Sequence, residues 1–141
     1  MNYELNKWTR DRPATEAIIV HSITRANTAK ELDILHRRAG YFCCGMHFCI
    51  DASGFSTTRH PDTIGHHLDG WDTHSLGIAF VGWDGKSPLS VDLAAYAHDL
   101  LDQLYYHYHV TAVAAPRLLG IEGYDPLQDF VREANARRPV S

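Results

Sequence analysis

Long apolar segments are missing from this chain, and no hydrophobic run approaches the ~18–20 residues needed to cross a bilayer. The first ten residues, MNYELNKWTR, lack the charged and then apolar order of a secretory signal peptide. Positive charge is also in deficit, with 13 Lys and Arg against 17 Asp and Glu and a net charge of −4. These absences predict a cytoplasmic protein that contacts no membrane and has no basic surface for binding nucleic acid directly.

Cysteine is scarce, with only Cys43, Cys44 and Cys49 in the whole chain. An odd, tightly spaced set does not suggest a disulfide framework. Cys44 and Cys49 lie five positions apart in an expected strand, so we predict that they face opposite sides as small buried hydrophobic groups. A cysteine nucleophile paired with His47 is the alternative, but no third orienting group is evident.

Histidine, in contrast, is abundant, with ten residues in a chain of 141. The hydrophobic fraction of 45% and the charged fraction of 21% are typical of one globular domain. Surface histidines are common, so the number alone does not decide between metal binding, acid–base chemistry and a structural role.

Hydrophobic periodicity and turn residues predict alternating strands and helices. Residues 17–23 form a continuous apolar run rich in β-branched residues, which is typical of a buried strand. The spacing of Thr28 and Glu31 predicts a helix N-terminus, and Ser90 precedes a longer helical pattern. The expected strands span 17–23, 44–51, 55–59, 75–83 and 109–115, and the expected helices span 28–39, 91–108 and a segment from 126 onward.

The resulting order, β-α-β-β-β-α-β-α, indicates an α/β fold: a single domain with a mixed central β-sheet flanked by helices. We expect an irregular lead-in over residues 1–16 and the folded domain over residues 17–138.

His21 stands inside the first apolar run, as either a hydrogen-bonded buried imidazole or a metal ligand. Four more histidines gather in the expected loop 60–74, at positions 60, 66, 67 and 74. Their spacing matches no standard zinc motif, which favours a polar loop lining a groove.

Four stretches resemble the zinc-dependent N-acetylmuramoyl-L-alanine amidases, the family of phage amidase-type lysozymes and peptidoglycan recognition proteins. They are IIVHSI (18–23), ILHRRAGYFCCGMHFCIDASG (34–54), IGHHLDGWDTHSLGIAFVGWD (64–84) and GYDPLQDF (123–130). The resemblance implies the amidase fold over roughly residues 17–130.

The resemblance also implies where the family's functional groups fall. Its first zinc ligand is matched by His21, but the second falls at Ala114 (Ala115 if the register slips) and the third at Ile121. The assisting Lys or Thr falls at Leu119, and the tyrosine that polarises the scissile carbonyl falls at Met46. A catalytic zinc needs about three protein ligands, so the resemblance implies that zinc, the family cofactor, is not retained.

Other positions match the walls of the family's groove, namely Tyr41, His47, His67 and Trp71. Trp71 lies in the loop sequence DGWD, and an exposed tryptophan is a better indication of binding than a buried one. The ligand-binding set predicted from the sequence is therefore His21, Tyr41, Met46, His47, His67, Trp71, Ala114, Leu119 and Ile121.

Three hypotheses follow. The first is a catalytically inactive protein of the amidase fold that binds a muropeptide or peptidoglycan fragment, or else a protein, as in a phage-type regulator of a polymerase. The second is an active zinc amidase with re-sited ligands, drawn from His66, His67 or His109. The third is an interaction module whose partner docks elsewhere, for example on the sheet edge or on the loop 60–74.

Overall fold

The computed structural model describes residues 17–41, 44–68, 70–116 and 126–139. The expected lead-in over residues 1–16 lies outside these ranges, and the domain bounds stay a prediction.

Five strands form one mixed sheet in the order β3-β2-β4-β1-β5. Strand β3 runs antiparallel to β2, whereas β4 pairs in parallel with β2 and β1, and β5 pairs in parallel with β1. The strands are β1 (Ala17–Ile23), β2 (Phe48–Asp51), β3 (Gly54–Thr57), β4 (Ser75–Val81) and β5 (Ala112–Ala114). This confirms the predicted α/β class with a mixed central sheet.

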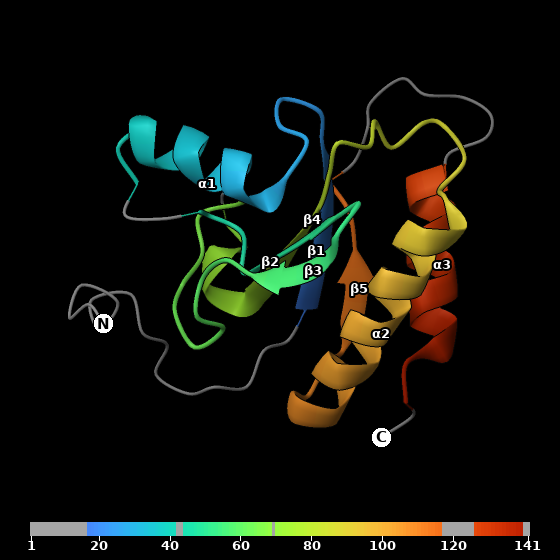
Figure 1. The fold of residues 1–141 in the computed structure, drawn as a ribbon. Helices are drawn as coiled ribbons and strands as arrows, with labels where there is room; N and C mark the ends of the chain where they lie inside the picture. The colour runs from blue at the N-terminus through green and yellow to red at the C-terminus, as the bar shows by residue number, and fades with distance from the viewer. Residues whose placement is uncertain (1–16, 42–43, 69, 117–125, 140–141) are drawn as a thin grey trace.

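Helices cover both faces of the sheet, with α1 on one side and α2 and α3 together on the other (Figure 1). The helices are α1 (Ala29–Arg38), α2 (Val91–His107) and α3 (Pro126–Arg137), and a short 3-10 helix, η2, spans Asp72–His74. The predicted caps are confirmed, because Thr28 Oγ1 accepts the N–H of Glu31 and Ser90 Oγ accepts the N–H of Leu93.

Alternation along β1 divides the core into two clusters. Ile18 and Val20 point to the face under α2 and α3, where the larger cluster also holds Phe80 and Phe130. The smaller cluster lies on the α1 face around Leu32. His21 is on this second face.

The predicted strand over 44–51 is wrong in its first half, since β2 begins only at Phe48. The N–H of Cys44 donates to Asp33 Oδ1 (2.7 Å), and the N–H of Gly45 donates to His36 Nδ1 (2.8 Å). Side chains of α1 therefore take the main-chain donors that a strand would have used.

The outer edge of β5 is closed by a side chain of α3. The Asn135 amide accepts the N–H of Val113 (2.8 Å) and donates to the Val113 carbonyl (2.7 Å). One amide thus occupies both main-chain groups that a further strand would have bonded.

Candidate functional site

His21 contacts a second imidazole brought to it from the loop before β4. His21 Nε2 lies 3.0 Å from His67 Nδ1, and the two rings meet edge to face with centroids 5.1 Å apart. His21 is 9% exposed and the side chain of His67 is fully buried. The structure therefore brings together two of the residues predicted from the sequence, 46 positions apart.

The loop that carries His67 is held in place by Asp72. Asp72 Oδ1 accepts the main-chain N–H of His67 (2.8 Å) and of Leu68 (2.9 Å). The same oxygen lies 3.7 Å from His67 Nε2. The carboxylate therefore fixes the loop and sets a negative charge beside the imidazole pair.

The hydrogen bonds also assign the protons in this pair. Ser75 Oγ donates its one proton to the carbonyl of Trp71 (2.6 Å), so it can only accept from His67 Nε2 (3.2 Å). His67 Nδ1 is then the acceptor, and His21 Nε2–H is its donor. The result is a relay from His21 through His67 and Ser75 to the main chain.

Burial sets the charge of His21. It lowers the pKa of His21 to about 3, with a further contribution from His67 and a partial offset from the Asp72 carboxylate. His21 is therefore a neutral imidazole at neutral pH, acting as a hydrogen-bonding group.

Glycine at position 77 makes room for the second imidazole. A Cβ at Gly77 would lie 2.6 Å from His67 Cγ, closer than real Cβ contacts allow. Glycine is required here because the His67 ring lies close to the backbone of β4. Gly77 is therefore part of the site although it offers no chemistry of its own.

His47, predicted to line the binding site, is fully buried, with both ring nitrogens engaged inside the fold. Nδ1 accepts the N–H of Gly77 (3.0 Å), so Nε2 carries the proton and donates to the carbonyl of Thr63 (2.7 Å). This imidazole ties the loop 60–65 to β4. It has no free nitrogen with which to activate a cysteine, which removes the basis for a Cys–His nucleophile.

Two of the positions that the resemblance assigns to the family's functional groups lie among the described residues, and neither has a polar side chain. Met46 is buried in the smaller core cluster. Ala114 pairs with Ile19 on the neighbouring strand, so alternation places it on the same face as His21. Leu119 and Ile121 lie outside the described residues.

The aromatic residues predicted for binding are partly at the surface. Trp71 is 52% exposed and directly precedes η2, next to Asp72. The ring of Tyr41 lies 4.4 Å from that of His66, which is exposed, and 5.5 Å from that of His36. These residues offer flat apolar surface with polar tips around the imidazole pair's loop.

The cysteines differ from the prediction that they face opposite sides. Cys44 and Cys49 are both fully buried in the smaller cluster, and their thiols share a hydrogen bond. That bond lowers the pKa of Cys44, whereas the same contact and burial raise the pKa of Cys49. The prediction failed because Cys44 precedes β2 and does not follow strand alternation, and Cys43 lies outside the described residues.

The donors among the described residues form no three-ligand zinc site around His21. Within the described part of the chain, no three His, Cys, Asp or Glu side chains converge on one point. His66 packs on Tyr41, and His109 lines a separate cavity beside Tyr105 and Pro139. Of the proposed replacement ligands only His67 reaches His21.

Asp72, Ser75 and Gly77 were not identified from the sequence. Ser75 and Gly77 lie in the quoted motif, but their link to His67 depends on how the loop folds back. The sequence indicated these two residues only as a serine and a glycine that follow His74 by one and three positions. Such residues are common where a strand begins.

Comparison with known proteins agrees with this fold. Residues 10–125 match the family model described as N-acetylmuramoyl-L-alanine amidase. The endolysin of Enterobacteria phage K11 is 33% identical over 76 residues, and the match covers about half of this chain and half of that protein. The chain therefore spans about half the length of the curated relatives it matches.

Solved structures share the architecture at low identity. The endolysin amidase LysCS from Clostridium intestinale is 22% identical with a TM-score of 0.72, and the alignment covers 86% of this chain and 84% of that one. Peptidoglycan recognition protein-LE, solved with tracheal cytotoxin, a monomeric diaminopimelic acid-type peptidoglycan, is 17% identical with a TM-score of 0.68 over 91% and 82% of the two chains.

Among the described helices, none is long and apolar enough to cross a membrane.

The match to the family model extends over most of the sequence and includes the strand that carries His21 and the loop that carries His67. The chain belongs to the N-acetylmuramoyl-L-alanine amidase family.

Proposed function

We propose that this protein binds a peptidoglycan fragment without hydrolysing it. The observation that carries the proposal is the contact between His21 and His67. The imidazole that the family uses for metal is neutral and donates its Nε2 proton to a second imidazole, which is itself bonded to Ser75. The Nε2 atom of His21 is therefore occupied by a hydrogen bond within the fold.

The chemistry of hydrolysis needs groups that these positions lack. The family's zinc supplies an activated water when it is bound by three protein side chains. Met46 and Ala114 offer neither a metal ligand nor an acid–base group, and Met46 is buried. Without a replacement for them, an amide bound beside His21 would stay intact.

Recognition needs fewer groups than catalysis, and the aromatic side chains near the imidazole pair support a binding role. Trp71 and Tyr41 can cover the apolar faces of sugar rings or peptide side chains, while exposed polar groups of the same loop can bond hydroxyls and amides. A protein of the same fold has been solved with a monomeric peptidoglycan fragment, which supports this class of ligand.

The test measures binding and turnover in the same sample. Purified protein is titrated with monomeric muropeptides by calorimetry, and the mixture is then examined by mass spectrometry for cleavage of the muramoyl–alanine amide. We expect saturable binding with intact ligand and no stoichiometric zinc in the purified protein. Chelator-sensitive release of stem peptides would overturn the proposal and would favour the active enzyme with re-sited ligands.

A matched pair of exposed aromatic residues locates the binding surface. Trp71→Ala is expected to weaken binding at least tenfold, since it removes a large exposed ring beside the site. Tyr106→Ala removes an aromatic ring that is 86% exposed on α2, across the sheet, and is expected to leave binding unchanged. Equal effects of the two variants would contradict the assignment of the surface.

A further inference from the structure

The outward main-chain groups at the two edges of the sheet differ in their hydrogen bonding. Asn135 closes the β5 edge, whereas β3 is the last strand on the other side. The N–H of Thr58 donates to the His47 carbonyl (2.8 Å), so the even-numbered residues of this segment direct their main-chain groups toward β2. The main-chain groups of Phe55 and Thr57 therefore point outward, and no described residue bonds to them.

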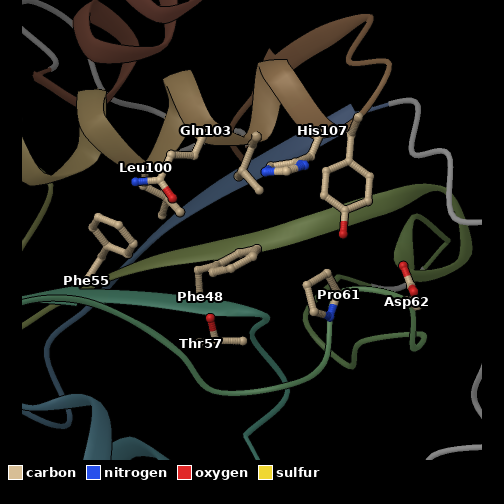
Figure 2. Close-up of a pocket in the computed structure, with 10 residues that line it drawn as sticks. Phe48, Phe55, Thr57, Pro61, Asp62, Leu100, Gln103 and His107 are labelled. Carbon is tan, nitrogen blue, oxygen red and sulfur yellow. The ribbon is translucent and has the colours of Figure 1, made fainter.

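A cavity borders this open edge on the α2 face. Its volume is about 470 Å³, and its apolar walls are formed by Phe48 and Phe55 from the sheet and by Leu100 from α2 on the opposite side (Figure 2). Polar groups stand at its margin, among them Asp62 and Gln103. A space of this size and character fits a large aliphatic or aromatic side chain.

A second cavity borders the same edge on the α1 face. It measures about 290 Å³ and is lined by Ser56 and Thr58 from the edge segment and by Lys30, Asp33 and Arg37 from α1. Arg37 is bonded to Asp33 (2.8 Å), while Lys30 is exposed and has no ion pair among the described residues. Two cations against one carboxylate leave a positive balance that favours an acidic group.

We infer that the edge of β3, which the described residues leave open, binds an extended acidic–apolar peptide segment of another protein by strand addition. Successive side chains of a strand point to opposite faces. A peptide added beside Phe55 and Thr57 therefore directs one side chain into the apolar cavity and the next toward Lys30. Main-chain bonds supply the affinity, and the two unlike cavities supply the sequence preference.

The size of the edge limits the strength of this interaction. β3 is four residues long, so only Phe55 and Thr57 offer outward main-chain groups. A contact of this extent belongs to the small, transient class of interfaces, with a Kd in the micromolar to millimolar range. The inference does not depend on the proposed binding of peptidoglycan, because β3 lies at the sheet edge and not beside His21.

The experiment uses a fluorescein-labelled heptapeptide of alternating Leu and Asp and measures fluorescence anisotropy against the full chain. N-methylation of alternate amides identifies strand addition, because only every second residue of an added strand faces β3. Methylation at the Leu positions is expected to weaken binding at least tenfold for antiparallel addition, with the Asp positions tolerant. The reverse pattern supports parallel addition, and equal effects at both sets would overturn the proposal.

Charge reversal provides the second arm. Lys30→Glu is expected to weaken peptide binding at least fivefold, and Lys86→Glu, an exposed lysine in the turn after β4, is expected to leave it unchanged. Both variants are checked for folding by circular dichroism and for unchanged muropeptide binding. Equal effects of the two lysines would overturn the proposal. Sedimentation of the unmodified chain tests the other occupant, since a dimer dissociated by the peptide would assign the edge to a second copy and overturn it as well.

Discussion

The two faces of the sheet are built from different chemistry. The face under α2 and α3 holds the larger cluster, whose buried members are aliphatic and aromatic and include the rings of Phe80, Trp83 and Phe130, which meet edge to face. The α1 face holds a smaller cluster with two thiols, and beside it the imidazoles of His21 and His67. Apolar packing is therefore concentrated on one face of the sheet, and the other face holds buried polar groups as well.

The largest effect is expected on the apolar face. Phe80→Ala removes a fully buried ring between two other aromatic residues and should lower the free energy of unfolding by about 3–5 kcal/mol. Urea denaturation at neutral pH measures it. The folded fraction should keep its ligand affinity, because the ring lies across the sheet from His21. A loss of stability under 1 kcal/mol would contradict the concentration of apolar packing on this face.

Acid should destabilise the α1 face through His21. The folded state holds this imidazole neutral down to a pKa of about 3, whereas the unfolded chain takes up a proton below the ordinary value of 6.5. The unfolded state thus binds more protons in this window, and stability falls as pH falls, by at most ~1.4 kcal/mol per unit and roughly 2–3 kcal/mol between pH 6.5 and 4.5.

The variant His21→Gln isolates this contribution, because glutamine hydrogen bonds without titrating. Denaturation midpoints of both proteins are compared across the window, with His67 and Asp72, the neighbours that also influence the pKa, left in place. Profiles that run parallel for the two proteins would show that His21 is protonated in the folded state.

A methyl group on β4 should disturb the site without touching the large core. Gly77→Ala places a Cβ against the His67 ring and is expected to cost about 1–3 kcal/mol, as overpacking does. Ligand affinity should fall together with stability, since the ring must move. A change in stability of less than about 0.5 kcal/mol would contradict the close packing of the His67 ring on β4.

The smallest expected effect concerns the end of the hydrogen-bond relay. Ser75→Ala removes the acceptor of His67 Nε2–H and should cost about 1 kcal/mol, the low end for a buried unpaired donor, because Asp72 Oδ1 lies only 3.7 Å away. The exposed Ser53→Ala should change stability by less than about 0.5 kcal/mol. Equal values would indicate that Asp72 replaces Ser75 completely.

Features decided by neighbours in the chain could be predicted from the sequence. Thr28 and Ser90 cap their helices because an oxygen two or three residues before a free N–H suffices, and no distant contact is involved. The buried strand at Ala17–Ile23 follows equally from a local apolar run. The family resemblance then supplied the sheet that joins these elements.

Features that depend on contacts between distant parts of the chain could not be predicted from the sequence. Residues 44–47 carry a strand-like pattern, but Asp33 and His36 of α1 bind their main-chain donors instead. The contact between His21 and His67 was only one of several pairings open to ten histidines. What selected it was the loop geometry set by Asp72 and the space left by Gly77, and neither appears in a local pattern.

Asn135 carries a consequence for how the chain can be shortened. Among the described residues, one amide near the end of α3 bonds both the N–H and the carbonyl of Val113 at the outer edge of β5. Removing the last turn of α3 would remove Asn135 and leave the main-chain groups of Val113 free to pair with a strand of another molecule. Fragments that end before Asn135 are therefore expected to aggregate where the chain with the full helix does not.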